Sequence, residues 1–268
     1  MKAHELLSHF LNQSPWIDPA TTVDRIIIGD ANKNIGKLLV VWQPSLEAVT
    51  YAAAGGYDAI MTHEPTFYFH KDELACVDAL PDASARKQTA LKKRRIIEDA
   101  GLTVIRNHDV WDRFPHIGIP YAWAKRLGLP DEPSATIFSE MQHQYAVAPI
   151  TAAAFAARMA ERLKTPPGQV QLFGDGGKVI TSVGIGTGCC CKIDRFAEMG
   201  CDAAIVCDDG TSYWSDLSLA IDMGMPVIRV FHATSEDDGI RRLAEYLRQH
   251  FPAMHTDYLP FDAKAGFL

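Results

Sequence analysis

The chain has 268 residues, 47% hydrophobic and 22% charged, which is ordinary for a globular protein with a sizeable core. Its net charge of −7 argues against non-specific binding to nucleic acid, because phosphate backbones are bound by basic surfaces. No apolar stretch approaches the roughly 20 residues that span a bilayer, and the N-terminus lacks the pattern of a secretory signal. The six cysteines form no Cys-x-x-Cys pair, which favours reduced thiols over a thiolate zinc site. We therefore expect a cytoplasmic protein with neither a membrane nor a nucleic-acid partner.

The first half of the chain reads as strands that alternate with helices. Strands are expected at 25–28, 37–42, 58–61 and 102–106. The strand at 37–42 reads as buried, because the apolar residues 38–41 run continuously rather than alternating. A helix from Ser45, a plausible N-cap, ends at Gly55-Gly56, and a basic helix covers about 84–100. Pro120 suits the first turn of the next helix.

The second half follows a proline-bearing joint at 130–133 and repeats the pattern. Strands are expected at 144–147, 170–173, 179–185, 202–207 and 227–231, with a helix over 151–163 and two more that end near 199 and 223. The last long helix is expected to start around Glu236, with Thr234 or Ser235 as its cap and acidic residues in its first turn.

Two stretches of the first half recur in the second. The segment 56–63 resembles 200–207, and 101–106 resembles 224–229, in the same order. Buried strands of α/β proteins look alike, which explains part of this similarity, but the repeated Asp-Ala and Val-Ile-Arg favour duplication. We predict an α/β protein of two similar halves, 1–130 and 131–268, with mostly parallel buried strands, facing each other across a metal-binding cleft.

Side chains suited to metal binding follow the predicted strands, at the sheet edge where α/β proteins place their ligands. Zn²⁺, Mn²⁺ and Fe²⁺ all accept such imidazole and carboxylate ligands, and five ligands exceed the need of one catalytic metal, so two metals are expected. Each residue alone has an ordinary structural explanation, such as a hydrogen-bonded histidine or an acidic residue that complements a helix dipole. The five predicted ligands are His63, Glu64, Asp112, His232 and Glu236.

Three motifs along the chain resemble those of the Nif-three-like family, also known as GTP cyclohydrolase I type 2 homologues. The family has a His-His-Pro segment, a His-x-x-x-Asp segment and a C-terminal His-x-x-x-Glu segment. The glycine-rich 184–188 and Asp208 also match its pattern, so the resemblance covers nearly the whole chain. The corresponding segments here are His63-Glu64-Pro65, His108 to Asp112 and His232 to Glu236.

The resemblance implies a two-metal site with His63, Asp112, His232 and Glu236 as ligands. Glu64 replaces the family's second histidine, and its harder carboxylate would favour Mn²⁺ or Fe²⁺. His108 would lie beside the site as an acid–base group, so Glu64 and His108 are the candidate catalytic residues.

Other chemistries fit the sequence less well. The 184–188 segment lacks the third spaced glycine of a dinucleotide loop, and Cys207 beside Asp208 reads more readily as an inert buried thiol than as a nucleophile. The favoured function is metal-dependent hydrolysis of a small molecule, including the ring opening of GTP that the resemblance implies. The alternative is a non-catalytic metal-binding or regulatory protein. The resemblance also implies a homo-oligomer, with a hexameric ring as one expected form.

Overall fold

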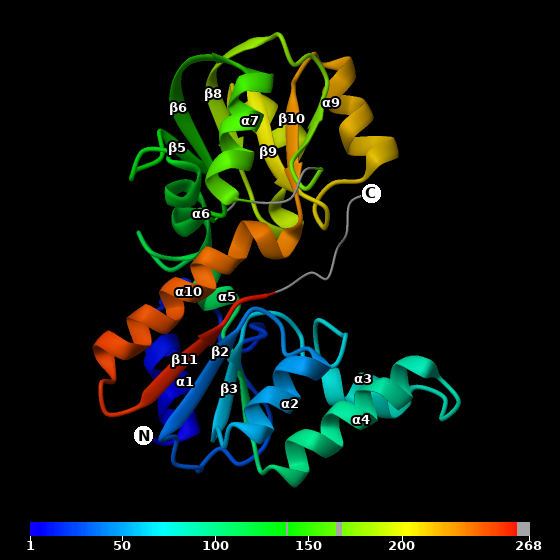
Figure 1. The fold of residues 1–268 in the computed structure, drawn as a ribbon, viewed down its shortest axis with the longest axis vertical. Helices are drawn as coiled ribbons and strands as arrows, with labels where there is room; N and C mark the ends of the chain where they lie inside the picture. The colour runs from blue at the N-terminus through cyan, green and yellow to red at the C-terminus, as the bar shows by residue number, and fades with distance from the viewer. Residues whose placement is uncertain (138, 165–167, 262–268) are drawn as a thin grey trace. The chain divides into compact units, whose positions relative to one another are not determined.

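The computed structural model describes residues 1–137, 139–164 and 168–261, which form two compact units (Figure 1). Unit 1 consists of Met1–Phe114 and Ile240–Phe261, and unit 2 contains Pro115–Gly239. The chain passes between them after Phe114 and again inside helix α10 (His232–His250). Unit 1 is therefore built from two separate stretches of chain, unlike the division at residue 130 expected from the sequence.

Unit 1 contains a five-stranded sheet in the order β1-β4-β3-β2-β11, with β1 antiparallel and the other neighbours parallel. Leu39, Ile60 and Val104 from its central strands pack with Val49 and Ile97 from the helices in one core cluster. The elements of unit 1 are β1 (Ile26–Ile28), β2 (Lys37–Val41), β3 (Ala59–Thr62), β4 (Thr103–Arg106), β11 (His255–Leu259), α1 (Ala3–Asn12), α2 (Leu46–Ala54), α3 (Glu73–Ala79), α4 (Ala85–Asp99), α5 (Asp109–Asp112) and the second part of α10.

Unit 2 contains a six-stranded mixed sheet in the order β5-β6-β8-β9-β10-β7, whose parallel part is β8-β9-β10. Tyr145, Val183 and Ile205 from the strands pack with Phe155 and Met159 of α7 in its main core cluster. The elements of unit 2 are β5 (Ala135–Ile137), β6 (Gln142–Thr151), β7 (Gln171–Phe173), β8 (Val179–Ile185), β9 (Ala203–Cys207), β10 (Val227–Val230), α6 (Ile119–Leu127), α7 (Ala152–Leu163), α8 (Ile193–Glu198), α9 (Ser218–Asp222), the 3₁₀ turn η1 (Gly188–Cys190), the π-helical η2 (Tyr213–Leu217) and the first part of α10.

The two sheets share a strand pattern that supports the predicted duplication. In unit 1 the order is β1-β4-β3-β2 and in unit 2 it is β7-β10-β9-β8, with the first strand antiparallel in each. The repeated aspartates have the same role in both. Asp58 accepts the backbone N–H groups of Gly36 and Lys37 at the start of β2, and Asp202 accepts those of Thr181 and Ser182 within β8. The α/β fold with mainly parallel buried central strands is thus confirmed.

The end of the chain differs from the sequence-based expectation in two respects. Helix α10 begins at His232, so the predicted start near Glu236 with Thr234 or Ser235 as cap is wrong. The reason is that Asp208, distant in sequence, accepts the backbone N–H of His232 at 2.6 Å and so caps the helix earlier. The chain then returns to unit 1, where β11 pairs in parallel with β2. Among the described residues, no helix combines the length and apolarity needed to cross a membrane.

His143 in β6 generates a prediction about acid stability. Its side chain is buried, with Nδ1 3.0 Å from the Tyr145 hydroxyl and Nε2 2.8 Å from the Glu140 carbonyl, and burial lowers its pKa from 6.5 to about 4. Between these values the unfolded chain binds a proton that the folded chain does not, so stability falls as the pH drops from 6.5 towards 4. A His143→Gln variant should lack this loss, which amounts to about 3 kcal/mol at most.

Urea unfolding of both proteins at a series of pH values from 4 to 8 measures the difference. His116→Gln, which removes an exposed imidazole, is the matched control. If the free energy of unfolding changed with pH in the same way in wild type and His143→Gln, the lowered pKa of His143 would be contradicted.

Candidate metal centre

In unit 1 the predicted ligands follow two adjacent parallel strands. β3 ends at Thr62 and is followed by His63 and Glu64, whereas β4 ends at Arg106 and leads through Asn107 and His108 into α5. Thr62 and Arg106 are direct partners in the sheet, so the residues after them emerge at the same edge. The structure therefore brings His63, Glu64, His108 and Asp112 together, as the sequence predicted.

His63 and Asp112 are the closest ligand pair of this group. His63 Nε2 lies 3.3 Å from Asp112 Oδ1, and the His63 side chain is fully buried. Nδ1 of the same ring lies 3.4 Å from the backbone carbonyl of Asn107, an arrangement that turns Nε2 towards Asp112. The His63 ring also stacks on that of His108, with centroids 4.4 Å apart.

The geometry of this pair fits a divalent cation. Asp112 Oδ1 is buried and accepts no hydrogen bond, although it lies 3.3 Å from an imidazole nitrogen. Tetrahedral ligands at about 2.0–2.2 Å from a metal ion are separated by about 3.4 Å, which is the spacing observed here. A buried carboxylate oxygen without a hydrogen bond is costly unless a cation or a water satisfies it.

Glu64 and His108 complete the unit 1 group. His63, Glu64 and His108 each offer a ligand atom, and these atoms all lie within 4.8 Å of one another. Glu64 Oε1 is 3.9 Å from His108 Nε2, while His108 Nδ1 lies 2.9 Å from Asp109 Oδ1 and 3.3 Å from Asp112 Oδ2. His108 is thus inside the group rather than merely beside it.

Burial and neighbouring charges shift the pKa of His108. Burial lowers the pKa of His108, but the carboxylate of Asp112 and the hydrogen bond to Asp109 outweigh this effect, so the pKa is raised overall. A divalent cation bound at the same point would oppose the protonated imidazole. The carboxylates beside His108 thus favour its protonated form, as an acid–base role requires.

Asp24, which the sequence analysis did not identify, holds this segment in place. Its buried carboxylate accepts the backbone N–H groups of His108, Asp109 and Val110 at the start of α5. Asp109 in turn accepts the Thr22 hydroxyl at 2.8 Å. Asp24 and His108 are separated by 84 residues, so no local pattern could have revealed the contact.

Unit 2 carries the second predicted group, His232 and Glu236, one turn apart in α10. His232 Nε2 lies 2.9 Å from Glu236 Oε1, and Asp209 Oδ2 is 4.0 Å from His232 Nδ1. The capping bond from Asp208 fixes the start of the helix and therefore the position of His232. Because these residues belong to unit 2, their convergence with the unit 1 group stays a prediction.

Gly188 lies close to this pair. It has a φ of +49°, and a Cβ added to it would lie 3.1 Å from His232 Nε2 and 3.5 Å from Glu236 Oε1. A side chain at position 188 would therefore crowd these two atoms, and glycine allows the close approach. Cys207 is buried, with its thiol 3.4 Å from the Gly188 carbonyl and 3.7 Å from Cys191 Sγ, and it packs as an interior residue.

The Asp24 contacts predict a measurable role in unit 1. Asp24→Ala should lower the free energy of unfolding by about 2 kcal/mol, because three backbone donors lose their acceptor. Hydrogen exchange at the amides of His108 to Val110 should accelerate more than exchange elsewhere in unit 1. Asp131→Ala, at an exposed aspartate, is the control. Unchanged exchange at these amides in Asp24→Ala would show that Asp24 does not hold the start of α5.

The chain resembles solved structures over nearly its whole length. The structure of protein ybgI, described as of unknown function, matches with a TM-score of 0.81 at 22% identity, covering 99% of this chain and 100% of that one. The Staphylococcus aureus hypothetical protein SA1388 matches at 0.79 and 18%, covering 100% and 99%. Reduced HcgD from Methanocaldococcus jannaschii matches at 0.75 and 17%, covering 97% and 98%. At these identities the likeness shows the fold alone.

A family model settles the relationship that the three motifs suggested. No protein with curated function matches the chain. The model described as Duf34/NIF3 (NGG1p interacting factor 3) matches residues 1–264. The chain therefore belongs to the Duf34/NIF3 family.

Proposed function

We propose that this protein is a metal-dependent hydrolase of a small molecule, with two divalent cations held by His63, Glu64 and Asp112 of unit 1 and His232 and Glu236 of unit 2. The observation that carries the proposal is the His63–Asp112 pair, with its 3.3 Å spacing and a buried carboxylate oxygen that accepts no hydrogen bond. The 2.9 Å distance between His232 Nε2 and Glu236 Oε1, with Glu236 buried, supports the second half of the donor set.

The donor set suits borderline to hard cations. It combines two imidazoles with three carboxylates, and Glu64 makes it harder than a site with a third histidine would be. Mn²⁺ or Fe²⁺ is therefore favoured more than at such a softer site, with Zn²⁺ as the other candidate. When bound, such ions would polarise a substrate oxygen and promote ionisation of water. Ring opening of GTP is one reaction of this class, and it belongs to the proposal only through the family resemblance.

The protein's own residues would handle the protons. His108 has its Nδ1 held by Asp109 and Asp112, so its Nε2, 3.9 Å from Glu64, is the ring nitrogen left to exchange a proton. Asp24 keeps His108 at this position through the backbone of α5. Glu64 then serves as a metal ligand and as the proton partner of His108.

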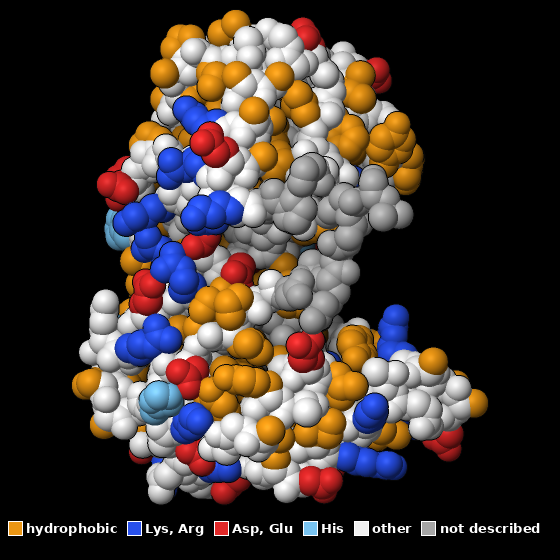
Figure 2. Space-filling view, viewed as in Figure 1, with side chains coloured by type: hydrophobic (Ala, Val, Ile, Leu, Met, Phe, Trp, Pro, Cys, Tyr) orange, Lys and Arg blue, Asp and Glu red, His pale blue; other side chains and the backbone are white. Residues whose placement is uncertain are grey.

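We also propose self-association of this chain, the ring-shaped homo-oligomer expected from the resemblance. Hydrophobic side chains gather over α9 (Figure 2). The exposed fraction reaches 68% for Tyr213 and 82% for Trp214 in η2, and Leu219, Ile221 and Met223 are also exposed. Apolar side chains clustered on a surface are typical of association sites.

Metal content tests the proposed donor set. After purification without chelator or immobilised metal, wild type should contain two divalent ions per chain, and Asp112→Ala should lose at least one, because the His63 pair loses its carboxylate. Mass spectrometry of the metals, with Asp131→Ala as control, gives the stoichiometry. Glu64→His should keep two ions but shift the preference from Mn²⁺ or Fe²⁺ towards Zn²⁺. Wild-type stoichiometry in Asp112→Ala would overturn the site.

Turnover separates the hydrolase from a non-catalytic metal-binding or regulatory role. Nucleotides, phosphoesters and small amides would be screened with metal-loaded protein. For a substrate that is turned over, His108→Gln should lower kcat by about 10²–10⁴-fold, since a general acid–base group contributes a factor of this size. Metal content of the variant must be measured in parallel. Stoichiometric metal without turnover on any of these substrates would favour the non-catalytic role.

A further inference from the structure

Two buried cysteines of unit 2 bring their sulfur atoms close together. Cys191 directly follows the 3₁₀ turn η1 and Cys207 is the last residue of β9, so the two are 16 residues apart in the chain. Both side chains are fully buried, and Cys191 Sγ lies 3.7 Å from Cys207 Sγ. The backbone N–H of Cys207 also donates to Cys191 Sγ at 3.1 Å. The proposed metal centre uses neither thiol.

The geometry of this pair is close to that of a disulfide. Both cysteines are free thiols in the structure. The sulfur atoms of a disulfide are about 2.0 Å apart, so the two atoms need to approach each other by roughly 1.7 Å. The Cys191 thiol donates to Cys207 Sγ and is thus already directed at the atom to which it would bond. Small side-chain movements are therefore enough to form the bond.

The pair lies directly beneath the surface of unit 2. The two residues after Cys207 and the residue after Cys191 are exposed. The turn 208–210 packs on the pair through Gly210, because a Cβ added to this glycine would lie 2.5 Å from Cys191 Cβ. Surface turns of this kind open locally at a small cost in free energy. A molecule about the size of water can therefore reach the two sulfurs without unfolding the unit.

The two thiols differ in how readily they ionise. The hydrogen bond from the Cys191 thiol lowers the pKa of Cys207, although burial opposes this effect. Burial raises the pKa of Cys191. Because the thiolate is the form that attacks an oxidant, Cys207 is the first nucleophile and Cys191 is the thiol that completes the disulfide.

Gly188 connects the pair to the start of α10. Cys207 Sγ lies 3.4 Å from the Gly188 carbonyl oxygen, and a Cβ added to Gly188 would lie 3.1 Å from His232 Nε2. A close-packed interior transmits such movements rather than absorbing them. When the Cys207 sulfur moves towards Cys191, the contact with the Gly188 carbonyl changes, and Gly188 moves relative to the His232 ring.

We propose that Cys191 and Cys207 form a reversible disulfide when the protein meets hydrogen peroxide, and that this bond shifts Gly188 relative to His232. The Cys207 thiolate attacks one peroxide oxygen, the O–O bond breaks, and the leaving hydroxide takes up the proton that the thiol released and departs as water. The Cys191 sulfur then attacks the sulfenic acid of Cys207. The S–S bond forms, the S–O bond breaks, and the hydroxyl group leaves with the Cys191 proton as a second water. Two thiols lose two electrons, which one peroxide gains.

The proposal goes beyond metal-dependent hydrolysis, and only one consequence depends on it. His232 is a proposed metal ligand, so a shift of Gly188 would link the oxidation of the pair to metal binding. This link rests on the proposed function, whereas the disulfide does not.

Peroxide treatment of the full chain in excess EDTA tests the proposal. Reduced protein would be treated with a molar excess of hydrogen peroxide at neutral pH, alkylated and digested without reductant, and the linked peptides identified by mass spectrometry. Most chains should contain the Cys191–Cys207 disulfide, and dithiothreitol should reverse it. Cys191→Ala should abolish the linked peptide. Cys201→Ala, which removes another buried thiol of the same core cluster, should leave it unchanged.

The NMR signals of the His232 ring report the shift of Gly188. Oxidation of wild type should move these signals, whereas those of His255 in unit 1 should stay in place, and Cys191→Ala should show no movement. A Cys191–Cys207 peptide that forms only in urea-unfolded protein would overturn the proposal, as would a disulfide in the folded protein that leaves the His232 signals unchanged. Because EDTA removes divalent cations, failure of the metal centre cannot produce any of these outcomes.

Discussion

Parallel strand pairing is the constraint on which both units depend. A parallel strand cannot be joined to its neighbour by a tight turn, so the chain must cross over and the carboxyl ends of neighbouring strands meet at one edge of the sheet. In unit 1 this constraint places the residues after β3 and β4 beside each other, which brings His63 to Asp112. In unit 2 it places Asp208, after β9, within reach of His232, after β10.

In both units, carboxylates that accept hydrogen bonds from backbone N–H groups fix the positions of strands and of helix starts. Asp58 and Asp202 hold the equivalent strands β2 and β8, whereas Asp24 and Asp208 hold the starts of α5 and α10. The first pair secures the sheets, and the second pair secures the helices that carry the proposed metal ligands. The duplicated units therefore use one device, charge-assisted bonds to the backbone, both for stability and for positioning.

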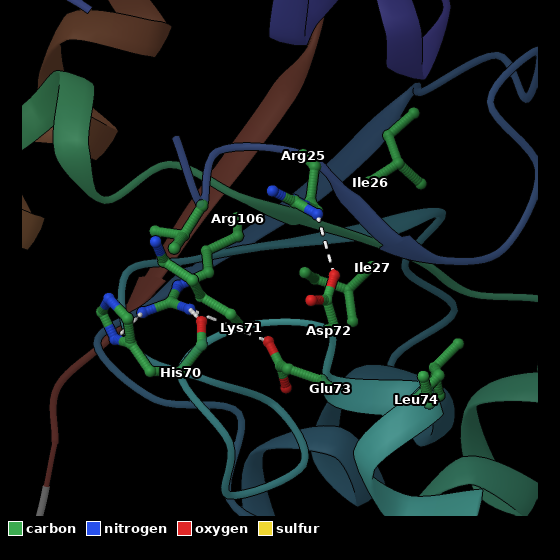
Figure 3. Close-up of a pocket in the computed structure, with 11 residues that line it drawn as sticks. Arg25, Ile26, Ile27, His70, Lys71, Asp72, Glu73, Leu74 and Arg106 are labelled. Atoms are coloured by element: carbon green, nitrogen blue, oxygen red, sulfur yellow. Dashed lines mark hydrogen bonds and ion pairs between the residues drawn. The ribbon is translucent and has the colours of Figure 1, made fainter. Parts of the chain in front are cut away.

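Unit 1 concentrates buried charge around Arg106. Its guanidinium donates to the carbonyl of His63 on one side and borders a cavity with Glu73 on the other (Figure 3). Burying an arginine is tolerable only where its donors are met, and here the carbonyl groups of His63 and His70 and the ring nitrogen of His70 meet them. The same side chain thus supports the strand end that carries a proposed metal ligand and lines a cavity in the same unit.

The amino-acid sequence alone predicted the buried strands, their mostly parallel pattern, the duplication and the candidate ligand residues at strand ends. These follow from hydrophobic runs and spacing within short windows, where neighbours in sequence are neighbours in space. Only the tertiary structure decided the contacts of Asp24 with α5, the start of α10 at His232, the pairing of β11 with β2 and the cavity above Arg106. Each joins segments far apart in the chain, and such contacts depend on three-dimensional packing that local periodicity does not encode.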